Sequence, residues 1–369
     1  MSDNWSRIVN TTITKYFRTV EDAVMRNRKL LAMLMDRGRV SMNNSGKDMD
    51  WKVKFKRGPL QGLLGGDTLT FAQRDRWRTA TLDWRGFAVT DSITKTEREK
   101  NKGTEAIVKV FSEMAKCMAS DLDDGFGDQL YVDGNAAGQE SSIHGIESFM
   151  GTSGPATNGY VGTPSDTYAG LSTALGNQGG TWSQSGGATT WPSGTGDAHY
   201  DFFSPLIVDY TDTAWQAATK TWPNTCIEAI RYGITKGQRN KSKSGKLDLI
   251  LLENELYRNL KDKYQAEENI YVPRNEGKGS LYSLGFTDVL NVDGTDVTFE
   301  YGVPSAVGYG WCLDLMEIMS LQSVLFKTEG PDRDIANQSD RVSVDFIGNV
   351  RFGNENGGVR NFIKMMSIT

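Results

Sequence analysis

The sequence has few of the residues on which catalytic and metal sites most often depend. Its two histidines, His144 and His199, lie in different segments, and neither has the spacing of a metal ligand. Its three cysteines, Cys117, Cys226 and Cys312, are far apart and include no CxxC pair. This spacing excludes a disulfide framework and a thiolate zinc site, so we expect buried free thiols and no bound metal.

Nucleotide-binding and hydrolase motifs are absent as well. There is no GxSxG or GxGxxG motif, and Gly245-Lys246 is followed by Leu247 without the upstream glycine of a phosphate-binding loop. No pair of carboxylates stands out as a general acid and base. We therefore expect a protein that is not an enzyme, with no catalytic residues and no cofactor.

Long apolar runs are also missing. No apolar h-region follows Met1, and no run approaches the length that spans a bilayer. These absences favour a chain that is made and folded in a cytoplasm, without contact to a membrane. The 369 residues instead include 40 glycines and nine tryptophans, which is typical of a loop-rich β protein with large contact residues. A chain of this length can hold two or three compact modules.

Positive charge is missing from one long stretch. Between Lys116 and Lys220 there is no lysine or arginine, whereas Asp and Glu occur 12 times. Residues 1–102, by contrast, carry 21 basic and 12 acidic groups. Two interpretations stay open: chance clustering of solvated charges, or a basic arm of one subunit that meets the acidic body of the next. Strong nucleic-acid binding needs a sustained basic field, which the chain lacks.

The clearest pattern in the chain is a long β-hairpin near its start. From 48 to 57, apolar and charged residues alternate: Met49, Trp51, Val53 and Phe55 against Asp50, Lys52, Lys54 and Lys56. A glycine-rich tip follows at 58–66, and a second run returns over 74–94. An isolated two-stranded hairpin is only marginally stable in water, and nothing nearby supplies a core for this one. We therefore expect it to lie on another protein surface, namely a neighbouring copy.

Two amphipathic helices flank the hairpin. The first is expected over 12–37, with Gly38 as its C-terminal cap, and the second over about 104–131. The basic face of the first fits an arm that clasps a neighbour or packs on its own body, and a membrane-surface helix is the alternative. The second ends in an acidic cluster, which is a set of solvated carboxylates, a weak cation site or a dock for a neighbour's lysines. The cluster consists of Asp121, Asp123, Asp124 and Asp128.

The rest of the chain predicts short strands and helices. Residues 151–200 are rich in Gly, Ser and Thr, which indicates surface loops and short β segments. Helices are expected over 224–234 and 253–264, and strands over 247–252, 289–292, 297–301 and 310–313. The run 341–368 alternates again around a Gly/Asn turn at 353–358, which predicts a C-terminal hairpin that joins an earlier sheet.

The order of these elements resembles the major capsid protein of tailed bacteriophages, a family with the Hong Kong 97 fold. Short local segments that are typical of that family occur in the same order over nearly the whole chain. They are Tyr131-Val132-Asp133-Gly134, Ile143-His144-Gly145-Ile146, Thr167-Tyr168-Ala169-Gly170-Leu171, Leu247-Asp248-Leu249-Ile250-Leu251 leading to Leu256-Tyr257, Gly285-Phe286, Asp293-Gly294, and Tyr309-Gly310-Trp311-Cys312-Leu313-Asp314.

The resemblance implies an α+β chain that is divided as that family is. Residues 1–46 would form the N-terminal arm and 47–94 the extended loop. The peripheral domain would hold 95–205, with its spine helix at about 104–131 and a Gly-rich insertion at 151–200. The axial domain would hold 206–325, and the C-terminal strands 326–369 would return to the peripheral domain.

The function that the resemblance implies is structural. The chain would assemble as hexamers and pentamers into the icosahedral head around a double-stranded DNA phage genome, in the host bacterial cytoplasm, and would end in the virion. Its partners would be copies of itself, a portal, a decoration protein, and packaged DNA that it contacts weakly. Because the helical arm starts at about residue 12, we expect a separate scaffolding protein rather than a fused one. No motif fixes a Lys–Asn cross-link, so none is expected.

Two alternatives remain open: an encapsulin-type nanocompartment shell, and a Trp-rich carbohydrate-binding or hydrolytic protein. For the assembling protein, we expect contacts between subunits to come from the basic hairpin and arm on one side and the acidic helix end on the other. The expected contact residues are Trp51, Lys52, Lys54, Phe55, Lys56, Trp77, Trp84, Arg26, Arg28, Asp121, Asp123 and Asp124.

Overall fold

The computed structural model describes residues 28–54, 61–62, 64–65, 68–69, 71, 73, 77–100, 104–155, 160–174, 203–237, 247–267, 288–355, 358–359 and 361–368. The helices are α2 (Lys29–Asp36), α3 (Lys95–Lys100), α4 (Thr104–Gln129), α5 (Trp222–Gly237) and α6 (Asn254–Glu267), with short 3₁₀ turns η1 (Ile146–Phe149) and η3 (Leu313–Leu315).

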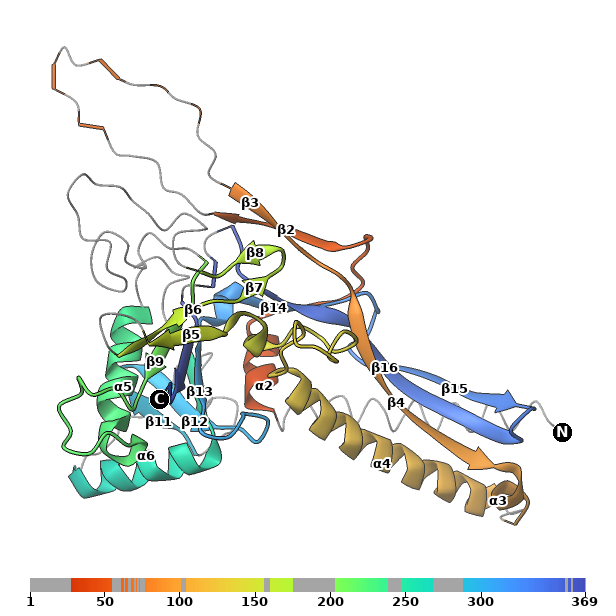
Figure 1. The fold of residues 1–369 in the computed structure, drawn as a ribbon. Helices are drawn as coiled ribbons and strands as arrows, with labels where there is room; N and C mark the ends of the chain where they lie inside the picture. Colours follow the sequence, from red (N-terminus) through yellow and green to blue (C-terminus); the bar gives the residue numbers. More distant parts are fainter. Residues whose placement is uncertain are drawn as a thin grey trace.

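The strands are β1 (Val40–Ser41), β2 (Met49–Lys54), β3 (Trp77–Leu82), β4 (Arg85–Thr94), β5 (Thr152–Pro155), β6 (Val161–Pro164), β7 (Thr167–Tyr168), β8 (Leu171–Ser172), β9 (Leu206–Asp209), β10 (Leu249–Leu252), β11 (Leu290–Val292), β12 (Thr295–Phe299), β13 (Gly308–Trp311), β14 (Met316–Ser320), β15 (Lys327–Asp334), β16 (Ser339–Phe352) and β17 (Ile363–Met366). They form an elongated molecule with a compact end and a long protrusion of β4, β15 and β16 (Figure 1).

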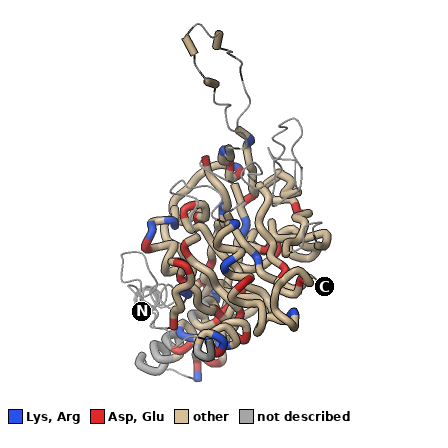
Figure 2. Tube along the Cα trace, turned by 90° about the vertical axis from the view of Figure 1, so that its left-hand side faces the viewer, with Lys and Arg blue, Asp and Glu red and all other residues tan. Residues whose placement is uncertain are grey.

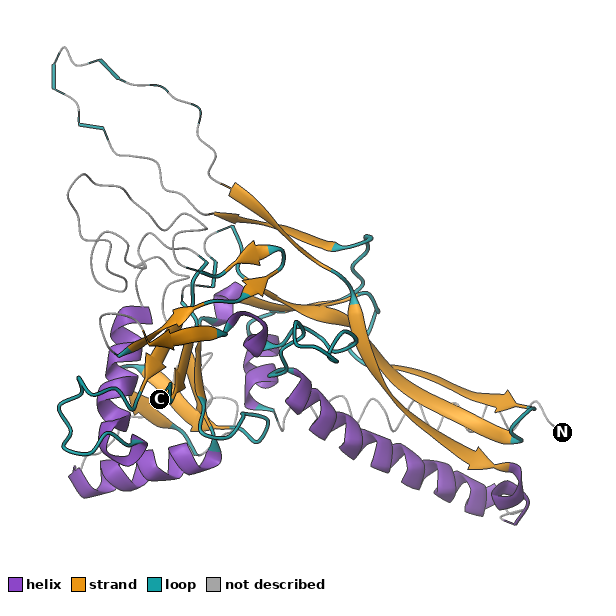
Figure 3. Ribbon diagram, viewed as in Figure 1, coloured by secondary structure: helices purple, strands orange, loops and turns teal. Residues whose placement is uncertain are grey.

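The compact end is built on an eight-stranded sheet in the order β11-β12-β10-β13-β17-β9-β6-β5. The pairs β10–β12 and β9–β17 are parallel, and the other neighbours are antiparallel. Helices α5 and α6 pack on one face of this sheet (Figure 3). The helices and strands expected over 224–234, 247–252 and 253–264 are confirmed as α5, β10 and α6.

Strand β10 shows why the core has two parts. Its side chains alternate between them: Leu249 and Leu251 face the large core that includes α2 and α4, and Ile250 and Leu252 face α5 and α6. All four side chains are buried. A strand covered on both faces has an uninterrupted apolar sequence, which is why the run Leu-Ile-Leu-Leu predicted it correctly.

The protrusion is a three-stranded arrangement with a helix beside it. The long strand β16 pairs with β4 and β15 in its first part and with β14 in its last part. Helix α4 lies along the sheet (Figure 1) and buries a stripe at helical spacing, namely Met114, Met118, Leu122 and Phe126. The Phe126 ring lies 5.9 Å from Phe346 of β16. The expected long helix is therefore confirmed as α4.

Helix α2 packs against the large core through Leu30, Leu31 and Leu34. Its end confirms the predicted cap at Gly38, which has φ +64°. The N–H of Gly38 donates to Met35 O at 2.9 Å, and the N–H of the next residue donates to Leu34 O at 2.7 Å. These are the two bonds of a Schellman motif. The remainder of the helix expected over 12–37 lies outside the described residues.

Two strand pairings differ from those expected. The run 341–368 is not a hairpin, because β16 lies in the protrusion whereas β17 lies between β13 and β9 in the eight-stranded sheet. β17 therefore pairs with β13 and β9 and not with β16. The expected return arm 74–94 is two strands, of which β3 pairs with β2 and β4 pairs along its whole length with β16. Alternation reports a buried face but not which strand lies alongside.

The described residues also correct one expectation about cysteine. Cys226 and Cys312 are buried free thiols, but Cys117 is exposed on α4. Burial raises the pKa of the Cys312 thiol. In the part of the chain that the structure describes, no helix has the length and apolar character to cross a membrane, and no cluster of His, Cys, Asp and Glu could hold a metal ion.

Candidate assembly surface at the root of the hairpin

The root of the hairpin packs on its own subunit. Trp51 is 6 % exposed, and its ring lies 6.2 Å from that of Tyr168 in β7. The Thr81 N–H of β3 donates to Ala169 O in the β7–β8 turn at 3.1 Å. The expectation that the hairpin has no core of its own is therefore wrong for its root, because the distant β7–β8 segment supplies that core. The Trp51 ring therefore packs within its own subunit.

Several described residues on the other face and in the outer part of the hairpin are exposed. Lys52 is exposed on β2, and Trp77 at the start of β3 is 42 % exposed. Further out, Leu64 is 77 % and Phe71 is 90 % exposed. The hairpin projects away from the body (Figure 1). Large apolar side chains that are exposed on one projecting element are typical of a protein-interaction surface. The expected contacts of Lys52 and Trp77 stay a prediction, and both residues are exposed.

Several expected contact residues fall outside the described part of the chain. These are Arg26, Phe55 and Lys56, together with the side chains of Lys54 and Asp123. Of the others, Asp121 is exposed on α4, and Trp84 is half-buried and donates its indole N–H to Gly46 O at 3.1 Å within its own subunit.

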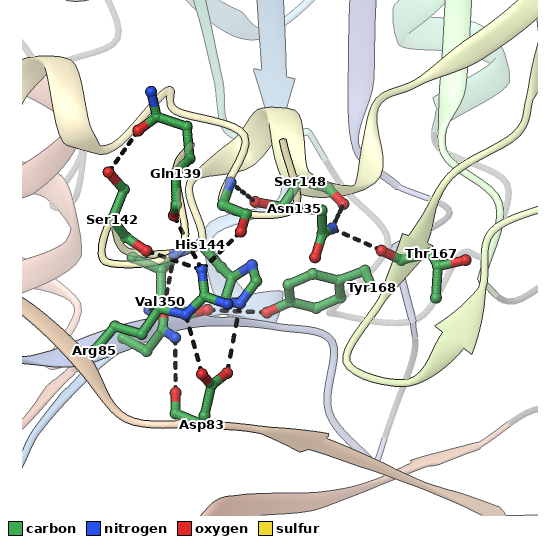
Figure 4. Close-up of polar contacts among 12 residues, drawn as sticks. Asp83, Arg85, Asn135, Gln139, Ser142, His144, Ser148, Thr167, Tyr168 and Val350 are labelled. Atoms are coloured by element: carbon green, nitrogen blue, oxygen red, sulfur yellow. Dashed lines mark hydrogen bonds and ion pairs between the residues drawn. The ribbon is translucent and has the colours of Figure 1, made fainter. Parts of the chain in front are cut away.

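The corner that joins the hairpin to the protrusion is held by Arg85, the first residue of β4. Its Nη1 donates to the carbonyl oxygens of Gly134, Ser142 and Gln139 at 2.7, 3.1 and 3.4 Å, and its Nε donates to Asp83 Oδ2 at 3.1 Å. Figure 4 shows this guanidinium pointing into the loop that follows α4. The direction in which the hairpin leaves the body is thereby fixed by hydrogen bonds to a charged group, which are stronger than neutral ones.

Asn349 of β16 also holds this corner through hydrogen bonds. Its Nδ2 donates to Asp83 O at 3.0 Å, and its Oδ1 accepts the N–H groups of His144 and Val350 at 2.9 Å each. The His144 ring is 3 % exposed, with Nε2 3.7 Å from Asp83 Oδ1. One buried amide thus links the hairpin corner, the loop after α4 and the central strand of the protrusion.

The titratable groups of the corner have shifted pKa values. Burial lowers the pKa of His144 to about 4; the positive charge of Arg85 adds to this, and Asp83 and Asp133 oppose it. Burial raises the pKa of Asp83, but the hydrogen bond and charge of Arg85 outweigh this effect and the pKa ends below its ordinary value. At neutral pH the corner therefore holds a neutral imidazole beside an Asp83–Arg85 ion pair.

The charges of the arm are also engaged within the subunit. Three basic residues near α2 pair with acidic residues from the later, acidic part of the chain. The pairs are Arg28–Asp124 at 3.4 Å, Arg37–Asp248 at 3.0 Å and Arg39–Asp314 at 3.1 Å. Figure 2 shows basic and acidic positions interspersed through the body. Part of the charge asymmetry is therefore satisfied inside one subunit, where Arg28 and Asp124 lie against each other.

Sequence reasoning missed the residues of the corner. Arg85 carries no pattern that separates it from other basic residues, and Asn349 is one polar residue in an alternating strand. His144 and Tyr168 were in segments that the resemblance singled out, but without a role. Their roles depend on contacts across more than 180 residues, with His144 bound to Asn349 and Tyr168 to Val350. No local signal could have found them.

Comparisons with known proteins support one fold. No protein-family model matches the chain, and no curated protein matches its sequence. Among solved structures, the chain is similar to one from the cyanophage A-1(L) capsid asymmetric unit, with 16% identity, a TM-score of 0.55 and coverage of 93% of each chain. It is also similar to one from the capsid of a native GTA particle, with 7% identity, a TM-score of 0.50 and coverage of 91% of each chain.

Both similarities extend over nearly the whole length of both chains, so they concern the overall architecture rather than one local motif. This mixed helix and sheet architecture is the one that the sequence resemblance implied. The chain has the fold of phage major capsid proteins.

Proposed function

We propose that this chain is a major capsid protein that assembles into hexamers and pentamers and builds the icosahedral head around the double-stranded DNA genome of a tailed phage. The observation that carries the proposal is the match to a cyanophage capsid chain along 93% of both chains. A fold alone does not fix a function. The proposal therefore also rests on the hairpin. Its exposed apolar side chains would be buried in an assembly, whereas in an isolated subunit they contact water.

The proposed division of the chain follows the resemblance, adjusted to the observed pairings. The arm ends in α2, which is anchored on its own body. The extended loop is the β2–β3 hairpin, and β4, β15 and β16 with α4 form the peripheral domain. The eight-stranded sheet with α5 and α6 forms the axial domain, and it takes in β17 and the β5–β6 pair, which were expected in the peripheral domain.

In the proposed shell, the outer part of each hairpin rests on a neighbouring copy. Lys52 and the residues that continue its alternation would face acidic groups of that neighbour, and Phe71 and Leu64 would be covered by it. The proposed partners are other copies of the chain, a portal, a separate scaffolding protein, a decoration protein and, weakly, the packaged DNA. The proposed location is the virion, after assembly in the cytoplasm of the host, and the proposed role is not enzymatic.

The encapsulin alternative is less well supported, because solved structures with a similar fold include chains of a cyanophage capsid and a GTA capsid. A Trp-rich carbohydrate-binding protein is also less well supported. Such a protein would expose its tryptophans, whereas Trp51, Trp215, Trp222 and Trp311 are buried in this one.

Assembly of the purified chain tests the proposal. The chain is expressed in bacteria with and without the proposed scaffolding protein, and the product is separated by sedimentation and viewed by electron microscopy. We expect closed shells of uniform size in at least one of the two preparations. A tip deletion, residues 58–66, is expected to reduce shell yield while the circular dichroism spectrum stays unchanged. A product that is monomeric under both conditions would contradict the proposal.

A further inference from the structure

The root of the hairpin has one strand edge that no described residue occupies. β2 pairs only with β3 among the strands that the structure describes. The Thr81 N–H, opposite Asp50, points away from β2 toward Ala169. Because hydrogen-bonded and non-hydrogen-bonded pairs alternate along an antiparallel ladder, the pairs that exchange bonds are those of Met49, Trp51 and Val53. The N–H and C=O groups of Asp50, Lys52 and Lys54 therefore point to the free edge.

A groove lies beside these residues. It has a volume of about 430 Å³ and is lined on one side by Asp50, Trp51 and Lys52, and on the other by Arg351, Asn354 and Glu355 at and beyond the end of β16. A groove of this size lies within the range of natural ligand sites. Its two walls come from the two elements that meet at the hairpin root, so the groove exists only when the root is docked.

Two of the lining residues, Trp51 and Arg351, each have a buried donor without an acceptor among the described residues: Trp51 Nε1 and Arg351 Nε. Trp51 is more than nine-tenths buried. A buried donor without a partner costs about 1–3 kcal/mol, so each is a place where a bound acceptor would be stabilising. Carbonyl and carboxylate oxygens are the acceptors that a polypeptide segment supplies.

We propose that an extended segment of a second copy of this chain adds to the free edge of β2 within this groove. Backbone bonds to Asp50 and Lys52 would hold the segment, and Trp51 and Arg351 would receive acceptors from it. The second copy is the chosen occupant because the groove adjoins the hairpin surface that the proposed function places against a neighbour. The inference thus rests on the proposed function.

Hydrogen exchange at single amides tests this inference. The purified subunit is compared with shells assembled from this chain alone. In the free subunit, the amides of Trp51 and Val53 are expected to be protected and those of Asp50 and Lys52 to exchange rapidly. In shells, the amides of Asp50 and Lys52 are expected to exchange at least about tenfold more slowly. Equal exchange of these two amides in subunits and shells would overturn the inference while leaving the proposed function intact.

Substitution of Lys52 provides a second test of the inference. Lys52→Pro removes an edge N–H that has no partner among the described residues, and edge positions tolerate proline. Lys52→Ala is the matched control for the lost charge. We expect K52P to melt near K52A but to assemble at least about tenfold less well. Equal yields of the two would overturn the inference. Protection that appears only when another protein is added would overturn the choice of a second copy, and failure of wild-type subunits to form shells under any condition would refute the proposed function itself.

Discussion

The hydroxyl of Tyr168 makes the hydrogen bonds to β16 that a neighbouring strand would otherwise make beside Val350. It donates to the carbonyl oxygen of Val350 at 2.9 Å and accepts the N–H of Phe352 at 3.2 Å. The Tyr168 side chain is fully buried, and burial raises its pKa, so the hydroxyl stays protonated as this donation requires. The same ring packs against Trp51 and thus connects β16 to the hairpin root.

Replacing Tyr168 with phenylalanine should therefore destabilise the subunit. It removes one oxygen atom and leaves two buried backbone groups without partners, each at a cost of about 1–3 kcal/mol. The free energy of unfolding from urea titration of the unassembled subunit measures the loss. Tyr160→Phe is the control, because the Tyr160 hydroxyl donates to Ala214 O at an exposed site. If Y168F were no less stable than Y160F, the hydroxyl would have no structural role.

The second prediction concerns pH. The pKa of His144 is lowered in the fold from 6.5 to about 4, so between these values the unfolded chain binds a proton that the folded chain does not. The stability that His144 contributes is complete above pH 6.5 and is lost as the pH falls toward 4. At pH 5 the loss should be about 2 kcal/mol.

Urea titrations at pH 7 and pH 5, for the wild type and His144→Gln, isolate this loss from that of the carboxylates. We expect the wild type to lose about 2 kcal/mol more than the variant over this interval. Nuclear magnetic resonance provides a direct check, because the chain has only two histidines. A His144 ring that titrates near 6.5 would contradict the buried, neutral imidazole.

Two glycines of α4 that are two residues apart should respond in opposite ways to alanine. At Gly125 an added Cβ would meet nothing within 4 Å, whereas at Gly127 it would lie 2.3 Å from Cζ of Arg28. Helix propensity alone favours alanine by about 0.5–1 kcal/mol at both positions. Gly125→Ala should therefore raise the melting temperature.

Gly127→Ala should lower the melting temperature, because it expels the buried Arg28 guanidinium from α4 and disturbs its pair with Asp124. Thermal denaturation followed by circular dichroism compares the two variants directly. An equal stabilisation by both would mean that Arg28 can leave its site at no cost, and that the arm is not anchored there.

Reversing the hairpin charges should impair assembly but not folding. In the triple variant Lys52→Glu, Lys54→Glu and Lys56→Glu, each lost ion pair is worth only about 0–1 kcal/mol, but every subunit of a shell repeats the loss. We expect a lower shell yield at low salt and a nearly unchanged subunit melting temperature. The matched control reverses three exposed basic residues of α5 and α6, Arg231, Arg258 and Lys261. Equal yields of the two variants would mean that the hairpin lysines make no special contact.

Local sequence patterns were sufficient to predict the individual helices and strands named here. The stripe of α4, the alternation of β2 and the uninterrupted apolar run of β10 each reflect a burial pattern that repeats along the chain. The cap at Gly38 is likewise local, since the bonds it permits lie within four residues of it. These features were predictable because each depends on a few neighbouring residues.

Two features were not predictable in the same way: which strands pair with each other, and which part of the protein buries a given side chain. The sequence around 353–358 resembles a hairpin turn, yet the strands before and after it belong to different sheets, because β17 completes the eight-stranded core. Trp51 has the pattern of a buried side chain, but nothing in that pattern identifies the subunit that buries it. The partner is Tyr168, which lies more than a hundred residues later in the chain and whose segment was known only by resemblance.

A cryo-electron microscopy reconstruction of particles assembled from this chain tests the central claim most directly. The account predicts a closed icosahedral shell of hexamers and pentamers, in which the outer hairpin of each subunit, with Phe71 and Lys52, lies against the adjacent copy. A particle without such rings, or a shell in which the hairpins extend freely into solvent, would contradict it.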